Sequence, residues 1–114
     1  MKKTNRVTAN QDFAKIVKTG LTRKNESFIV HELPNTLGKT RIGISVSSKL
    51  GCAVIRNRIK RQVRAICDEL VDFNLLSLDL VVVVKHQYLS NDFGRNKELL
   101  KSLLIVERRP QNEK

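Results

Sequence analysis

The longest regular pattern of apolar and polar positions spans residues 53–70, which read AVIRNRIKRQVRAICDEL. Apolar residues recur there at steps of three and four, which places them on one face of an α-helix. This apolar stripe consists of Ile55, Ile59, Val63, Ile66 and Leu70. The pattern predicts a long helix over residues 53–70 that packs one face against the core.

A shorter helix is predicted near the start of the chain. Asn10 is its expected N-cap, and Gly20 is expected to end it. Its apolar side consists of Phe13, Ile16 and Val17. Phe13 is either a core residue or an aromatic surface on which a base can stack, and the pattern alone leaves both interpretations open.

Alternating apolar and polar residues predict strands over residues 27–33 and 40–47. A further strand between residues 20 and 33 is one interpretation, and the alternative is that the polar residues 22–26 form only a loop. Residues 78–85, LDLVVVVK, are apolar on both faces, which indicates a strand inside the sheet. A last helix is expected over about residues 95–106.

The order helix, strands, long helix, strand, helix predicts an α+β fold with helices packed on a mixed sheet. A chain of 114 residues suits a single domain over residues 1–114. Residues 1–8 and 108–114 show no periodicity and are expected to be flexible. The apolar run over residues 78–84 is far too short to span a bilayer, and the basic start of the chain lacks the apolar core of a signal peptide. We therefore expect a cytoplasmic protein with no membrane partner.

The charges indicate a kind of partner. The chain has 22 Lys and Arg against 11 Asp and Glu, a net charge of +11. The side of the long helix opposite its apolar stripe is basic, although like charges at i,i+4 spacing destabilise a helix. Acids come only after the basic run, at Asp68 and Glu69. The basic residues of the run are Arg56, Arg58, Lys60, Arg61 and Arg64, and Asn57 lies among them.

A polyanionic partner would account for this basic side, and nucleic-acid phosphate is the expected one. The alternative is a solvated basic face, which is the usual interpretation of an isolated charged helix. A membrane surface is the competing polyanion, but the apolar stripe contains no Trp, Tyr or Phe, and interfacial helices favour such residues.

Catalytic and metal-binding patterns are missing from the sequence. No Ser-His-Asp set or carboxylate pair beside a His suggests itself, and Lys49 with Gly51 matches only a fragment of a phosphate loop. Cys52 and Cys67 would lie roughly 22 Å apart along a continuous helix, too far for a disulfide. Neither Cys is spaced with a His as in a zinc site. The sequence therefore indicates a binding protein rather than a self-contained catalyst.

Residues 41–64, RIGISVSSKLGCAVIRNRIKRQVR, resemble the signature region of the bacterial ribonuclease P protein subunit. That family has a strand, a basic-glycine turn and a helix that opens on Arg-Asn-Arg, here Arg56, Asn57 and Arg58. NQDFAKIV near the start is similar to the family's first helix. The resemblance covers essentially the whole chain in order.

The resemblance implies a four-stranded mixed sheet with three helices and a left-handed strand–helix–strand crossover, whereas the general rule predicts a right-handed one. It also implies a function. The family's protein assists a catalytic RNA that removes the 5′ leader of precursor tRNA by endonucleolytic cleavage. Mg²⁺ would be held mainly by the RNA, the chain alone would be inactive, and no protein partner would be required.

Two groups of site residues follow from the resemblance. Contacts to the catalytic RNA are implied for Lys49, Arg56, Asn57, Arg58, Lys60, Arg61 and Arg64. A cleft between the first helix and the sheet would hold the single-stranded leader, lined by Phe13, Val17, Ile29 and His31. Many family members have aromatics where Val17 and His31 stand, so weaker stacking is expected here. Cys52 stands where an Asn often precedes the long helix, which puts a side-chain N-cap in doubt.

Two other function classes remain at this stage. A ribosomal or other structural RNA-binding protein would show the same basic helix without any role in processing. A self-contained nuclease would need clustered acids to hold metal ions, and the acids of this chain are scattered.

Overall fold

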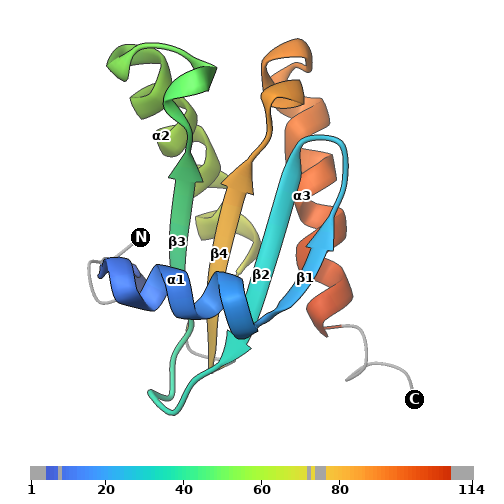
Figure 1. Cartoon of the computed structure of the whole chain (residues 1–114). Coiled ribbons are helices and arrows are strands. Elements are labelled where there is room, and N and C mark those ends of the chain that lie inside the picture. The colour runs from blue at the N-terminus through green and yellow to red at the C-terminus, as the bar shows by residue number, and fades with distance from the viewer. Residues whose placement is uncertain (1–4, 8, 72, 74–76, 109–114) are drawn as a thin grey trace.

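The computed structural model of the chain describes residues 5–7, 9–71, 73 and 77–108 (Figure 1). Three α-helices, four strands and two short 3₁₀ helices alternate along the described residues. In chain order they are α1 (Asn10–Thr19), β1 (Leu21–Lys24), β2 (Phe28–Pro34), β3 (Arg41–Val46), η2 (Ser48–Leu50), α2 (Ala53–Leu70), β4 (Leu78–Val84), η3 (His86–Ser90) and α3 (Phe93–Arg108).

The strands form one mixed sheet in the order β1-β2-β4-β3. β2 pairs antiparallel with β1 and β4, whereas β3 pairs parallel with β4. The apolar strand β4 therefore lies inside the sheet, as its sequence predicts. The open question of a further strand between residues 20 and 33 is also answered, because Leu21–Lys24 form the edge strand β1.

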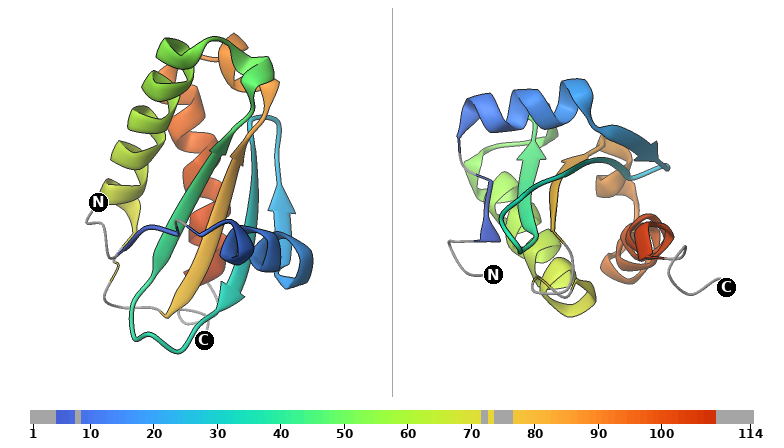
Figure 2. Two further views of the ribbon diagram at one scale, coloured as in Figure 1. Left: turned by 60° about the vertical axis from the view of Figure 1, so that its left-hand side comes forward. Right: turned by 90° about the horizontal axis from the view of Figure 1, so that it is seen from below.

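The helices lie on both faces of the sheet. α1 crosses one face, and α2 and α3 cover the other (Figures 1 and 2). β3 and β4 run side by side in the same direction and are joined through α2. With α2 behind the sheet, the chain steps from β3 rightward to β4 in Figure 1, which makes the crossover left-handed. The implied α+β fold and its rare crossover are thus confirmed.

The larger core lies between the sheet and the pair α2 and α3. Phe28 and Val30 of β2 point into it, together with the apolar stripe of α2. The alternation of β2 therefore turns Ile29 and His31 toward the α1 face. In the stripe, Ile59, Val63 and Ile66 are buried, and Ile55 and Leu70 are partly buried.

A smaller core lies under α1. Ile16 of α1 and Val81 of β4 are buried there together with Val7, and Phe13, Leu33 and Val83 pack around them. Val7 is only 4% exposed, and its backbone N–H donates to the carbonyl of Ile42. Residues 5–7, which belong to the segment predicted to be flexible, therefore pack against β3. Residues 1–4, 8 and 109–114 lie outside the described part of the chain.

Two helix starts differ from the sequence prediction. Ala9, not Asn10, is the N-cap of α1, and it makes no side-chain cap hydrogen bond. α3 begins at Phe93 rather than near Arg95. The reason is Asp92, whose carboxylate accepts the backbone N–H of Arg95 at 2.8 Å and so caps the first turn.

Candidate nucleic-acid interface

Two of the four predicted leader residues, Phe13 and Val17, lie on α1, and the other two, Ile29 and His31, lie on β2 and face the α1 side of the sheet. Phe13 and Ile29 are half-buried, Val17 is 43% exposed and His31 is 9% exposed. The register places Ile29 opposite Val83 and His31 opposite Val81, whose side chains belong to the α1 face. The structure thus places the four residues on the α1 side of the sheet, together with Val83, which the sequence analysis did not single out.

His31 is held inside this region rather than on its surface. Its Nδ1 and the hydroxyl of Thr22 on β1 form a hydrogen bond of 2.9 Å. Burial lowers the pKa of His31 below its ordinary value, so the imidazole is neutral at pH 7. Little of its ring can reach a ligand, which leaves Phe13 as the main aromatic surface of the four.

The ring of Phe13 lies directly on Gly43 of β3. A Cβ added at Gly43 would overlap the ring atoms of Phe13, so no larger residue fits there without moving the ring. The sequence analysis predicted the Gly and Ser side of this strand only as a smooth polar face. The missed signal is the single Gly within an alternating strand, which often marks a close approach.

A hollow of about 290 Å³ begins at Phe13 and Gly43 and continues around the edge strand β3 to α2. Lys60 and Arg64 of α2 line its far side, and Arg6 also lines it. None of the residues that line the hollow is acidic. The two groups of residues implied by the resemblance are therefore connected at the edge of β3.

The polar side of α2 is basic in the structure, as predicted. Arg56, Lys60 and Arg64 are half-buried along one row, and Arg56 donates from Nε to the carbonyl of Gly51 at 3.1 Å. Asn57, Arg58 and Arg61 are exposed, as is Lys49 in η2 just before the helix. None of these cations makes an ion pair with a described residue.

One predicted residue stands apart from the row. Arg58 lines a second, smaller hollow together with residues of η3 and α3, away from Lys60 and Arg64. At the start of α2, Cys52 is the N-cap and makes no side-chain cap hydrogen bond, as its replacement of Asn suggests. Cys52 and Cys67 are both free thiols, as predicted.

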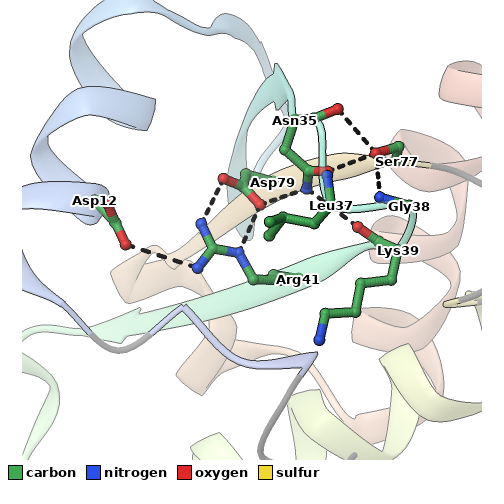
Figure 3. A network of polar contacts seen from close by, with 8 residues as sticks. All are labelled: Asp12, Asn35, Leu37, Gly38, Lys39, Arg41, Ser77 and Asp79. Carbon is green, nitrogen blue, oxygen red and sulfur yellow. Dashed lines mark hydrogen bonds and ion pairs between the residues drawn. The ribbon is translucent and has the colours of Figure 1, made fainter.

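A polar network joins α1 to the starts of β3 and β4 (Figure 3). Arg41 of β3 donates from Nε and Nη2 to the two carboxylate oxygens of Asp79 on β4, at 2.9 and 2.7 Å. Asn35 donates to the same carboxylate at 2.7 Å, and Asp12 of α1 lies 3.7 Å from Arg41. Burial alone would raise the pKa of Asp79, but the hydrogen bonds from Arg41 and Asn35 hold it below its ordinary value.

The carboxylates of this network do not form a metal site, because Asp12 and Asp79 share the guanidinium of Arg41. Across the described residues, no group of three His, Cys, Asp or Glu is arranged to hold a metal ion. The described helices also include none with the length and apolar character needed to cross a membrane.

Comparison with known proteins gives a consistent result. The ribonuclease P family model matches residues 1–106. The ribonuclease P protein component of Mesoplasma florum is 34% identical over 106 residues, which cover 92% of this chain and 96% of that protein. The component of Streptococcus pneumoniae serotype 4 is 41% identical over 85 residues, covering 75% of this chain and 69% of that protein.

Solved structures show the same fold. A Staphylococcus aureus ribonuclease P protein mutant with defective mRNA degradation activity superposes with a TM-score of 0.85 at 32% identity, covering 93% of this chain and 90% of that one. The ribonuclease P protein of Thermotoga maritima superposes with a TM-score of 0.75 at 32% identity, covering 87% and 94%.

Proposed function

The chain belongs to the ribonuclease P protein family, and from this premise we propose that it assists a catalytic RNA in removing the 5′ leader of precursor tRNA. Membership makes it a protein component of tRNA 5′ processing. The proposal concerns the finer points, which are the RNA contacts, the leader contacts and the division of labour in catalysis.

The observation that carries the proposal is the unpaired basic side of α2. Its cations have no carboxylate partners among the described residues, although pairing would stabilise the isolated helix. A phosphate backbone supplies the missing negative charge, and counterions released from the RNA add to the affinity. We assign contacts with the catalytic RNA to Lys49, Arg56, Asn57, Arg58, Lys60, Arg61 and Arg64.

The leader is proposed to lie along the α1 face, against Phe13, Val17, Ile29 and His31. Single-stranded RNA is held by stacking surfaces together with cations that follow its backbone. Phe13 supplies the stacking surface, and the hollow around β3 leads from it to Lys60 and Arg64. A strand of RNA on this face would therefore meet positive charge as it approaches the catalytic RNA.

Catalysis is assigned to the RNA subunit and to Mg²⁺ bound mainly by that RNA. The described residues offer no donor set for a metal ion and no arrangement of acid and base. The contribution of this chain is to bind substrate and to neutralise phosphate charge. We place the assembled endonuclease in the cytoplasm and propose no membrane contact and no further protein subunit.

The test is to incubate precursor tRNA with the chain, with the ribonuclease P RNA of the same cell, and with both. Cleavage at the leader junction by the RNA, improved by the chain at low Mg²⁺, is the expected result. Binding of RNA without any effect on cleavage would instead indicate a structural RNA-binding protein. Cleavage by the chain alone would indicate a self-contained nuclease.

A further inference from the structure

We propose that the hollow between the start of α2, η3 and the start of α3 binds one unpaired base of the catalytic RNA. Phe93 would provide the stacking surface, and Arg58 would bind the adjoining phosphate. The inference rests on the proposed function, because it takes the RNA as partner. It concerns the face of the sheet opposite α1, away from the leader residues, and Figure 2 shows η3 and the start of α2 at the same end of the sheet.

Phe93 and Leu89 leave apolar surface exposed at this hollow. Phe93 is 43% exposed and Leu89 44% exposed, and both line the hollow. Among the described residues, Phe93 is the one exposed aromatic side chain. An exposed aromatic ring beside a cation is the combination that single-stranded nucleic acids use for stacking.

The inner walls of the hollow are fixed before any ligand arrives. The hydroxyl of Tyr88 donates to Gln62 Oε1 at 2.7 Å, and its ring meets that of Phe28 edge-to-face with centroids 5.6 Å apart. The amide of buried Asn96 donates to the carbonyl of Tyr88 at 3.0 Å. Burial raises the pKa of Tyr88 to about 12, so its hydroxyl keeps the proton that it donates. A preformed wall reduces the entropy lost on binding.

Charge favours RNA as the occupant. Arg58 is exposed and makes no hydrogen bond or ion pair with a described residue. No acidic residue is among those that line the hollow. Arg58 also belongs to the same helix as the cations proposed to bind the catalytic RNA. A phosphate group on Arg58 would therefore extend that contact around the helix.

Size favours one base rather than a free small molecule. The hollow has a volume of about 190 Å³, below the roughly 300–1,000 Å³ that is usual for small-molecule pockets. It can hold one flat part of a larger ligand while the rest stays outside. The amide nitrogen of Gln62, which has no partner among the described residues, can donate to the edge of that base.

The first test compares Phe93→Ala with Leu37→Ala, a matched control at an exposed Leu in the turn between β2 and β3. Phe93→Ala removes the surface on which the base stacks, so it should weaken binding to the ribonuclease P RNA about five- to tenfold. Leu37→Ala should leave the affinity unchanged. If Arg58 and Phe93 hold the same nucleotide, the double variant R58A/F93A should lose less than the product of the two single losses.

The second test uses the lack of Trp in the chain. Phe93→Trp introduces a single indole, whose emission should be quenched when ribonuclease P RNA is added, whereas that of Leu37→Trp should not change. Equal RNA affinity of the native chain and Phe93→Ala, or an emission of Phe93→Trp that saturating RNA leaves unchanged, would overturn the inference. A dimer of the native chain in sedimentation experiments that Phe93→Ala abolishes would also overturn it, because Phe93 would then be buried between two copies. If the native chain itself fails to bind the RNA, the proposed function fails instead.

Discussion

Phe13 can lie on the sheet because the strand residue beneath it has no side chain. Gly43 sits within an extended strand, where Ala would ordinarily be tolerated or stabilising. We predict that Gly43→Ala instead lowers the free energy of unfolding by about 1–3 kcal/mol, because its Cβ must displace the Phe13 ring. Urea denaturation measures the change.

A double-mutant cycle isolates this contact. In a Phe13→Ala background the ring is gone, so adding Gly43→Ala should cost little more. In the assembled enzyme, Gly43→Ala should also weaken binding of precursor tRNA more than binding of mature tRNA, because the displaced ring belongs to the proposed leader surface. A cost that is the same with and without Phe13 would show that Gly43 acts through something else.

His31 makes the stability of the fold depend on pH. Burial lowers its pKa in the folded state, whereas in the unfolded chain the pKa is about 6.5. As the pH falls below about 6.5, the unfolded state therefore binds more protons, and the free energy of unfolding decreases. We predict that this decrease between about pH 7 and pH 5 is smaller in His31→Gln, which cannot take up the proton.

The exposed His86 provides the control for this prediction. Carboxylates such as Asp79 also contribute to acid sensitivity, but they are common to both variants, so the difference between them isolates His31. The profile of His86→Gln should follow that of the native chain. Parallel profiles for His31→Gln and the native chain would contradict the assignment of His31 as a buried neutral side chain.

At the scale of elements, α2 separates its two tasks by face. Its apolar stripe holds the core, so changes on the opposite side should affect RNA binding and not folding. We predict that Arg61→Ala changes the free energy of unfolding by no more than about 0.5 kcal/mol. The negative slope of log affinity against log salt should become shallower by about one. Lys39→Ala, which removes the same charge from the turn before β3, should leave the slope unchanged. A lower melting temperature with an unchanged salt slope would show that Arg61 is structural.

Elements with a long, regular pattern of apolar residues could be predicted from the sequence. The bounds of α2 agree with the prediction because its stripe repeats over five turns of helix, and β4 was recognised because both of its faces are apolar. The edge strand β1 stayed ambiguous because three of the four residues of LTRK are polar. The start of α3 was missed although Asp92 is an ordinary N-cap residue, so that signal was present in the sequence.

Contacts between distant residues could not be predicted from periodicity. Arg41 and Asp79 are 38 positions apart, and only the parallel register of β3 and β4 makes them neighbours. Phe13 and Gly43 meet only because α1 crosses that strand. For the same reason, Arg58 was grouped with the other cations of its helix, whereas the structure turns it toward η3 and α3.

At the scale of the whole molecule, the left-handed crossover keeps the two faces of the sheet separate. With β3 and β4 in their observed places, a right-handed connection would put α2 on the same face as α1. The left-handed path sends α2 to the other face, where it joins α3 over the larger core. α1 lies on the opposite face, and the first hollow connects the two faces around the edge strand β3.

This arrangement leads to a prediction about where catalysis resides. The chain carries a net charge of +11, and its described residues include no metal-binding group of acids. Its proposed role is to concentrate and neutralise phosphate while the RNA subunit carries out the chemistry. We predict that the purified chain cleaves no precursor tRNA at any Mg²⁺ concentration, and that adding it to the ribonuclease P RNA lowers the Mg²⁺ needed for half-maximal cleavage.

Substitution of the acids one at a time by their amides completes this test. If the RNA subunit carries out the chemistry, as proposed, turnover of the assembled enzyme should stay within a few fold for each variant. Asp79→Asn is the informative case, since it weakens the buried pair with Arg41 and should cost about 3 kcal/mol of stability. Its turnover per folded molecule, measured below its melting temperature, should nevertheless match that of the native chain. Cleavage by the chain without RNA, abolished by one amide substitution, would assign the catalysis to the protein.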